Sequence, residues 1–409
     1  MKVLFVSNYL YLDGPPIALY RLIKEFKKNN SFEISVLSFL DGPLRKWYEK
    51  LGINPIVGNY YDPTVGNIKA LVTLIKKEKP DLVFANMMDT VNVILAANIC
   101  KVPSIFYVHE DWAAINLSTY HLFAFKMADL VVFPSSYLRK VYAPILANVP
   151  TKVINNGLDF DEFSPSFTNK SPEEMKARLN LPLGKKIVSL VGIVCERKRQ
   201  DLFVVVACDI LKTRDDLVFL IIGRFSEQDP FYARLKKLVE TAGLSEKILF
   251  VGEHEDPRQF YHISDLIVCP SSNDVTPYAI LEALAFGKPV IATSIDGIPE
   301  ILGNSQAGLL IKPLDRDDLG KALVHVIDHY GQYKNGASQL AKSMSKKFSI
   351  QKTANVFSNQ IINLKLRKKK YAVKLVKGQQ INFIAKRDTI ISLKKLVPTV
   401  QRKSTSAFR

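Results

Sequence analysis

The sequence predicts an α/β protein with two doubly wound parallel sheets, and three observations support this fold class. Short apolar runs, typical of buried parallel strands, alternate with helical segments along most of the 409 residues. Single hydrophobic cores stop growing at about 250–300 residues, so a chain of this length has more than one domain. A Pro- and Ser-rich linker near residue 165 separates two such alternating series. Sheets of this kind bind ligands at the carboxyl ends of their strands.

The N-terminal domain is expected to span residues 1–165. Each predicted strand is a run of Val, Ile, Leu or Phe bounded by polar or turn residues. In chain order the strands are Lys2–Ser7, Ile34–Phe39, Pro55–Val57, Asp81–Ala85, Ser104–Val108 and Leu130–Phe133, and the helices are Ile17–Lys28, Ile68–Lys77 and Val91–Ile99. His109 follows the strand SIFYV, where a polar side chain faces the ligand-binding edge of such a sheet. His109 is therefore a candidate site residue, although a lone histidine is often structural.

The C-terminal domain is expected to span residues 166–350. Its predicted strands are Lys186–Val191, Phe219–Gly223, Ile248–Gly252, Leu266–Cys269 and Pro289–Thr293, and its helices are Pro172–Leu179, Phe231–Ala242, Pro257–Ile263 and Tyr278–Phe286. After the first of these strands comes Gly192, followed closely by Arg197 and Lys198. A Gly turn followed by cations is suited to the oxygens of a diphosphate, which accept charge-assisted hydrogen bonds. A solvated basic turn is the alternative.

A loop, a helix and a strand in the middle of this domain indicate an anion site. Thr276 is expected to cap the helix and Pro277 to be its first residue, while Gly287 ends it. A helix N-terminus offers free N–H groups and positive dipole character to a phosphate. Asp274 precedes the cap and Glu282 leans back toward the same end, where carboxylates suit sugar hydroxyls. The alternative is a plain helix cap with a surface acid.

The spacing of Asp274 and Glu282 resembles the acid-x7-Glu signature of retaining glycosyltransferases of the GT-B fold, family 4. That family has an Ala-rich helix, a Gly-x-Pro turn and a strand ending in Thr after the signature. The corresponding residues here are Ala283, Ala285, Gly287, Pro289 and Thr293. Asp274 stands where the family usually has Glu. The resemblance covers roughly residues 1–360 and is strongest over 186–311.

The resemblance implies two Rossmann-like doubly wound domains facing a central cleft, with the acceptor bound by the first and the nucleotide sugar by the second. Gly14, in the loop after the first strand, is then expected near the donor phosphates. His109 is expected near the donor sugar and the acceptor. The loop that follows Gly252 and contains His254 is expected to hold the nucleotide base through its backbone.

The same resemblance assigns roles in the second domain. The family motif has Gly-Arg followed by Glu-Lys-Gly, and Lys198 corresponds to the lysine of that motif. Ile193 replaces the family's arginine and Arg199 its second glycine, so Arg197 is expected to supply the missing charge. Together with the helix N-terminus these cations would neutralise the leaving diphosphate, which is the role of a metal ion in other enzymes. No metal and no other cofactor is therefore expected.

The implied function is transfer of a sugar from a nucleotide-diphosphate sugar to a glycan or lipid-linked glycan, with retention of anomeric configuration. His109 and Asp274 would touch the donor sugar, and Glu282 the ribose. Two alternatives are a GT-B nucleotide-sugar epimerase and a catalytically impaired nucleotide-sugar-binding protein. The departures from the family pattern are the reason for considering the second alternative. The base, the sugar, the acceptor and the linkage are not defined by the sequence.

Composition adds expectations about location. The four cysteines form no C-x-x-C pair and lie in apolar segments, as reduced cysteines of a cytosolic protein do. No run of eighteen apolar residues is present, so no membrane-spanning segment is expected. A cytoplasmic location follows.

The positive charge is concentrated at the C-terminus, in a region of residues 351–409 expected to hold a helix and a basic tail. Residues 363–409 contain 14 Lys or Arg and one acid, a net charge of +13, which leaves +4 of the total of +17 for residues 1–362. A solvated disordered tail, a nucleic-acid arm and a membrane-surface segment are the three interpretations. Interleaved aliphatic residues argue against the first, and the lack of a nucleic-acid-binding fold against the second. Peripheral attachment to the anionic inner face of a membrane is the hypothesis that follows.

Overall fold

The computed structural model contains two compact α/β units. Unit 1 comprises residues 1–155 and 353–409, and unit 2 comprises residues 156–352. The structure describes residues 1–112, 117–365, 372–375, 381–384 and 390–392, with side chains up to residue 364. The basic side chains on which the membrane hypothesis depends therefore lie almost entirely outside the described residues.

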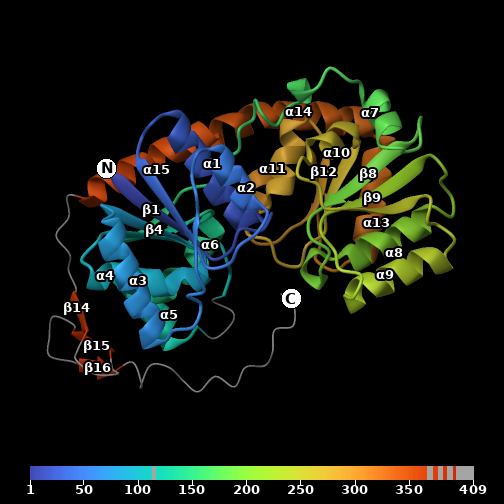
Figure 1. Ribbon diagram of the computed structural model, residues 1–409. Helices are drawn as coiled ribbons and strands as arrows, with labels where there is room; N and C mark the ends of the chain where they lie inside the picture. The colour runs from blue at the N-terminus through green and yellow to red at the C-terminus, as the bar shows by residue number, and fades with distance from the viewer. Residues whose placement is uncertain (113–116, 366–371, 376–380, 385–389, 393–409) are drawn as a thin grey trace. The chain divides into compact units, whose positions relative to one another are not determined.

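Unit 1 contains a parallel seven-stranded sheet in the order β3-β2-β1-β4-β5-β6-β7 (Figure 1). The strands are β1 (Lys2–Ser7), β2 (Glu33–Ser38), β3 (Ile56–Val57), β4 (Leu82–Asn86), β5 (Ser104–Tyr107), β6 (Leu130–Phe133) and β7 (Thr151–Val153). The helices are α1 (Gly14–Lys28), α2 (Leu44–Lys50), α3 (Val65–Glu78), α4 (Val91–Ile99), α5 (Thr119–Met127), α6 (Ser136–Tyr142) and α15 (Ile350–Lys365). Strand order reverses between β1 and β4, so this pair is the switch point at which ligands bind in such sheets.

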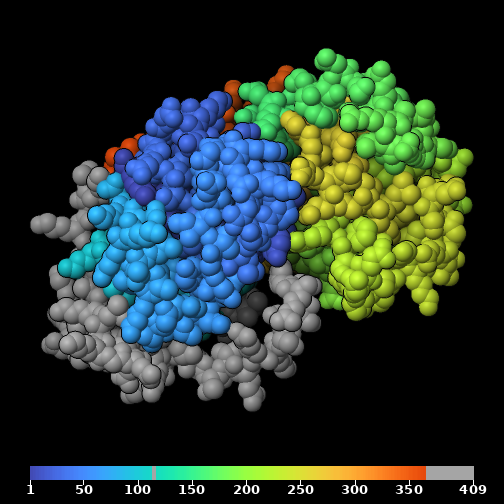
Figure 2. All heavy atoms as spheres, in the orientation of Figure 1, coloured from blue at the N-terminus to red at the C-terminus, as the bar shows by residue number. Residues whose placement is uncertain are grey.

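The core of unit 1 includes a helix from the far end of the chain. Phe84 in β4 packs on Phe5 in β1 and on Phe357 in α15, with ring centroids 5.3 and 5.2 Å away. Phe357 and Ile361 are completely buried in this core. In the space-filling view of Figure 2, blue segments from early in the chain make up most of the coloured surface of unit 1.

Unit 2 contains a parallel six-stranded sheet in the order β10-β9-β8-β11-β12-β13. The strands are β8 (Lys186–Val191), β9 (Leu217–Ile222), β10 (Ile248–Gly252), β11 (Leu266–Cys269), β12 (Val290–Thr293) and β13 (Gly308–Ile311). The helices are α7 (Pro172–Arg178), α8 (Gln200–Ile210), α9 (Pro230–Thr241), α10 (Arg258–Ile263), α11 (Tyr278–Ala285), α12 (Pro299–Leu302), α13 (Arg316–Asp328) and α14 (Tyr330–Lys347). Helices α8, α9 and α13 cover one core, and α7 and α10 cover another. The switch point of this sheet lies between β8 and β11.

The strand predictions are confirmed, with ends displaced by one or two residues, and the α/β two-sheet fold class is confirmed. Helix α1 begins at Gly14, three residues earlier than predicted, because Pro15 and Pro16 occupy its first turn, where a missing N–H costs nothing. Three further strands, β14 (Ala372–Leu375), β15 (Ile381–Ile384) and β16 (Ile390–Ser392), form an antiparallel sheet. Within the described part of the chain, no helix is long and apolar enough to cross a membrane.

Candidate functional site

Three glycines bring neighbouring strand ends of unit 2 close together. Gly192 follows β8, Gly223 follows β9 and Gly252 ends β10, and all three have a positive φ. The N–H of Gly192 donates to Ile222 O at 2.8 Å, and that of Gly223 to Gly252 O at 2.9 Å. A Cβ at position 223 would lie 2.1 Å from the carbonyl oxygen of Gly192, so only glycine fits there. The predicted Gly192 turn is thus held against the next strand end.

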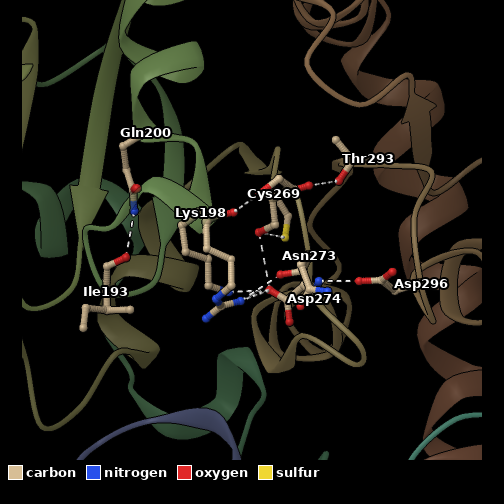
Figure 3. A network of polar contacts seen from close by, with 11 residues as sticks. Ile193, Lys198, Gln200, Cys269, Asn273, Asp274, Thr293 and Asp296 are labelled. Atoms are coloured by element: carbon tan, nitrogen blue, oxygen red, sulfur yellow. Dashed lines mark hydrogen bonds and ion pairs between the residues drawn. The ribbon is translucent and has the colours of Figure 1, made fainter. Parts of the chain in front are cut away.

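A buried glutamine shapes the turn that follows Gly192. The Gln200 amide donates to Ile193 O at 2.9 Å (Figure 3). It also accepts from the N–H of Cys195 at 3.2 Å. A 3₁₀ turn over Glu196–Lys198 comes next, and Arg199 then adopts the left-handed conformation with φ 58°. This conformation favours glycine, the residue that the family usually has there. Sequence reasoning missed Gln200, which reads as an ordinary polar residue at a helix start.

The loop after β11 is bonded to this turn across the switch point. The N–H of Ser272 donates to Arg197 O at 2.9 Å, and the Arg197 guanidinium donates to Asn273 O at 2.9 Å. The Lys198 ammonium forms an ion pair with Asp274, and an Arg197 nitrogen lies 3.7 Å from the same carboxylate oxygen. Figure 3 shows the Lys198 and Asp274 side chains pointing toward each other from the two loops. The predicted cations and the predicted acid therefore meet at one place.

Asp274 is the centre of this cluster. Its side chain is 12% exposed, and the hydroxyl of Ser271 donates to it at 3.4 Å. Its backbone N–H donates to the carboxylate of Asp296 at 2.7 Å. Burial raises the pKa of the Asp274 carboxyl, but Lys198 and Arg197 outweigh burial and hold that pKa below its usual value. Asp274 is therefore ionised at neutral pH. The sequence analysis assigned no site role to Asp296, which lies in the turn after β12.

The predicted cap of helix α11 is wrong. The helix begins at Tyr278, and its N-cap is Pro277, with an extended ψ of 121° and no capping side chain. Thr276 lies one residue too early to accept a helix N–H, because the capping oxygen must come from the N-cap residue itself. Its hydroxyl oxygen is buried and has no hydrogen-bond partner among the described residues. Buried polar atoms are normally paired, so this oxygen suits a ligand at the helix N-terminus.

Glu282 lies inside α11 and is almost fully buried. Its Oε2 accepts a hydrogen bond of 2.7 Å from the hydroxyl of Tyr261, which is itself completely buried in α10. Sequence reasoning missed Tyr261, because no local pattern connects two residues on different helices. The structure thus fixes the orientation of a carboxylate predicted to bind ribose.

The loop after Gly252 has its own internal supports. The ring of His254 packs edge-on against Phe260, with centroids 4.7 Å apart. Asp256 and Arg258 form a bidentate pair, with both N···O distances 2.8 Å. These contacts anchor the loop whose backbone is predicted to hold the nucleotide base.

In unit 1, His109 lies at the carboxyl end of β5. Its Nε2 is 2.8 Å from Asn86 Oδ1, and the amide nitrogen of Asn86 donates to Pro15 O at 3.1 Å. Because that amide nitrogen is committed to a carbonyl, Asn86 presents its oxygen to the ring, so Nε2 carries the proton and donates. Burial lowers the pKa of His109 to about 3, so the imidazole is neutral at physiological pH. Gly14 is the first residue of α1, next to Pro15.

Two carboxyl groups accompany His109 at this edge of the sheet. Glu110 accepts the backbone N–H groups of Met88 and His109 at 3.2 and 3.1 Å. Burial raises the pKa of Glu110 to about 8, with a further contribution from the Asp89 carboxylate. Asp89 accepts from the Asn8 amide at 3.2 Å across the switch point of this sheet. Asn8 and Asp89 were missed, although both follow strands that border the switch point.

No cluster of three or more His, Cys, Asp or Glu suited to a metal ion occurs in the described ranges of the chain. The Asp159-x-Asp161 sequence of the linker has a local role. Asp159 Oδ1 accepts the N–H groups of Asp161 and Glu162, both at 3.1 Å, and so forms a turn.

Each unit matches a family of known proteins. The family model "Glycosyltransferase Family 4" matches residues 13–162, and the model "Glycosyl transferases group 1" matches residues 171–346.

Similar proteins include two mannosyltransferases of lipopolysaccharide core biosynthesis and a galactosyltransferase. The lipopolysaccharide core biosynthesis mannosyltransferase LpsB of Rhizobium meliloti is 32% identical over 52% of this chain and 60% of the relative. The mannosyltransferase LpcC of Rhizobium leguminosarum is 31% identical over 44% of this chain and 50% of the relative. The chain thus spans between half and two thirds of the length of these two proteins. The UDP-Gal:alpha-D-GlcNAc-diphosphoundecaprenol alpha-1,3-galactosyltransferase of Escherichia coli is 27% identical over 74% of this chain and 82% of the relative.

Proteins of known structure share the fold of this chain. Anabaena HepE, crystallised in complex with UDP and glucose, superposes with a TM-score of 0.79 at 19% identity, covering 89% of this chain and 100% of that one. The sucrose-phosphate synthase of Thermosynechococcus elongatus gives a TM-score of 0.71 at 17% identity, covering 89% and 98%. At these identities the likeness shows a shared fold.

Proposed function

The chain belongs to the family 4 glycosyltransferases of the GT-B fold, and we propose that it transfers a sugar from a nucleoside-diphosphate sugar to a glycan or lipid-linked acceptor. In this proposal the anomeric configuration is retained and no metal ion takes part. Unit 2 binds the donor and unit 1 binds the acceptor.

The observation that carries the proposal is the convergence of Arg197 and Lys198 on Asp274 at the switch point of unit 2. A diphosphate is an anion of the kind that these two cations would bind. The N-terminus of α11 and the Thr276 hydroxyl, which has no partner in the described part of the chain, would supply further donors. Asp274, released from Lys198, would then accept hydrogen bonds from hydroxyl groups of the donor sugar. Glu282 would accept hydrogen bonds from the hydroxyl groups of the ribose.

The chemistry follows from where charge develops. As the bond from the sugar to the diphosphate breaks, negative charge grows on the leaving phosphate, and fixed cations in a water-poor site stabilise that charge. Lys198 and Arg197 would take this role, which supports a reaction without a metal ion. The acceptor hydroxyl would attack the face from which the diphosphate departs, and a phosphate oxygen would take its proton. No side chain acts as nucleophile in this scheme.

His109 fits a role other than proton transfer. A general base must accept a proton near the working pH, and a pKa of about 3 is too low for that. As a neutral ring whose Nε2 proton is committed to Asn86, His109 would orient a sugar by contact and hydrogen bonding. Glu110 and Asp89 would lie on the acceptor side of the reaction.

Two relatives support the substrate classes. The Escherichia coli relative uses a UDP-sugar and a diphosphoundecaprenol-linked acceptor, as its name states, and Anabaena HepE binds UDP and glucose. A membrane-embedded acceptor of that kind would also give the basic tail a purpose, which is to hold the enzyme at an anionic surface.

The test is a transfer assay with UDP-, GDP- and ADP-sugars and with undecaprenyl-diphosphate-linked and free glycan acceptors. Product anomeric configuration is read by NMR, and each reaction is repeated in EDTA. The proposal predicts a product with the donor's anomeric configuration and the same rate in EDTA. Inverted product, a rate abolished by EDTA and restored by divalent metal, or donor epimerisation without transfer would each contradict it.

A further inference from the structure

The contact between Tyr261 and Glu282 joins two helices on one face of unit 2. Tyr261 lies in α10, and its ring stacks on Phe286 with centroids 5.9 Å apart and planes 25° from parallel. Its hydroxyl donates to Glu282 Oε2 at 2.7 Å. Tyr261 is 0% exposed and Glu282 7% exposed. A short hydrogen bond between buried groups thus connects a rigid aromatic ring to a flexible carboxylate.

This bond limits the freedom of the Glu282 side chain before any ligand arrives. Glutamate has several rotatable bonds, and holding it in one rotamer costs conformational entropy. If the side chain were free, this cost would be subtracted from the free energy of ligand binding. A carboxylate has about four acceptor positions, and the Tyr261 hydroxyl uses one of them. The ring of Tyr261 cannot follow a moving carboxylate, because Phe286 stacks against it.

We propose that Tyr261 is a positioning residue that holds Glu282 for the 2′- and 3′-hydroxyls of ribose, and so makes the site select ribonucleotides over deoxyribonucleotides. This inference rests on the proposed donor site, in which Glu282 binds ribose. Tyr261 itself touches no substrate in this scheme. It acts through the carboxylate that it orients.

A purely structural role makes a different prediction. Burying a hydroxyl without a partner is costly, so the bond to Glu282 would then exist only to satisfy Tyr261. Removing that hydroxyl would lower stability but would change affinity for nucleotides with and without ribose hydroxyls equally. Selectivity, not affinity or stability alone, therefore separates the two roles.

The experiment measures the affinity of UDP, GDP and ADP, and of their 2′,3′-dideoxy counterparts, by isothermal titration calorimetry on the full chain. The ratio of ribo to dideoxy affinity is compared in the native protein, Tyr261→Phe and Glu282→Gln. Tyr333→Phe is the matched control, because Tyr333 is buried to a similar degree in the same unit, where its ring packs on His325.

We expect Tyr261→Phe to reduce this ratio on the order of three- to tenfold, the effect of one hydrogen bond, and Tyr333→Phe to leave it unchanged. An unchanged ratio in Tyr261→Phe overturns the positioning role. An unchanged ratio in Glu282→Gln, or no binding by any of the three nucleotides, overturns the donor site itself and the role of Tyr261 with it.

The double variant Tyr261→Phe/Glu282→Ala keeps the test decisive if the single tyrosine variant unfolds, because it leaves neither a buried charge nor an acceptor without its donor. If Tyr261 acts only through Glu282, the double variant has the same ratio of ribo to dideoxy affinity as Glu282→Ala measured alone. A further loss of selectivity in the double variant overturns the proposal.

Discussion

Lys198 and Asp274 form an ion pair across the switch point of the sheet in unit 2, and each side chain is only 12% exposed. Lys198 comes from the turn after β8 and Asp274 from the loop after β11. The Asp274 carboxylate is thus paired with the ammonium group that the proposed diphosphate requires. Donor binding would therefore exchange one anionic partner of Lys198 for another.

This exchange predicts the behaviour of Asp274→Asn. Removing the carboxylate's charge frees Lys198, so a free nucleoside diphosphate should bind as tightly as before or severalfold more tightly. Transfer should fall sharply, because the sugar loses its contact. Calorimetry with the free nucleotide and a transfer assay measure the two effects. The control is Asp209→Asn, which removes an acid paired with Arg316 on the surface of the same unit. Weaker nucleotide binding in Asp274→Asn would contradict the exchange.

Glu282→Ala and His109→Ala should separate the two proposed sites. If Glu282 holds ribose hydroxyls, its loss weakens the binding of free nucleotide and of nucleotide sugar alike, by roughly tenfold or more for bonds to a charged group. His109→Ala should leave free nucleotide binding intact and remove transfer. Titrations of both variants with nucleotide, followed by turnover assays, provide the comparison. The opposite pattern would mean that the two assignments are interchanged.

The raised pKa of Glu110 predicts a pH dependence of stability. Burial first, and the Asp89 carboxylate second, raise this pKa from 4.5 to about 8. Between these values the folded state binds a proton that the unfolded state has lost, so stability falls as pH rises through about 8. His109 has the opposite effect on stability. Because burial lowers its pKa from 6.5 to about 3, stability falls as pH falls below 6.5.

Glu110→Gln replaces the carboxyl by a neutral amide of the same size. Urea unfolding of both proteins at pH 7 and pH 9 should show a smaller loss of unfolding free energy in the variant. Both pH values lie above the histidine range, and the comparison with the variant isolates the contribution of Glu110, because the other titrating groups are the same in both proteins. Equal losses in the two proteins would contradict the assignment of the raised pKa.

The basic tail should bind anionic membranes. Residues 366–409 contain 13 Lys or Arg and one acid, and each cation near such a surface contributes about 1 kcal/mol. The comparison chain should end at Lys365, because Leu364 is buried in the core of unit 1 and α15 ends there. Cosedimentation with phosphatidylglycerol-containing vesicles at low salt should capture the full chain and not the shortened one. Capture of both, or of neither, would remove the membrane role.

Much of the fold follows from local patterns, because buried parallel strands are uniform apolar runs. The site follows only in part. Lys198 was predicted from the Gly turn before it and Asp274 from the helix start and Glu282 after it, but their pairing depends on which strands are neighbours. The Thr276 cap failed because Thr-Pro fits equally well when proline is the N-cap and when it is the first helical residue. Tyr261 had no signal, because its partner lies on another helix. The return of α15 to the core of unit 1 had none either.

The most direct test of the donor site is the affinity of Lys198→Ala and Arg197→Ala for the nucleotide sugar that binds tightest among UDP-, GDP- and ADP-sugars. Each charge-assisted bond contributes about 1.5–3 kcal/mol, so Lys198→Ala should lose roughly 10- to 150-fold in affinity by calorimetry. Arg197→Ala should lose less, because that side chain is 46% exposed. Lys236→Ala, which removes an exposed lysine of the same unit, should lose nothing. Unchanged affinity in both Lys198→Ala and Arg197→Ala, with the fold intact, would contradict the account.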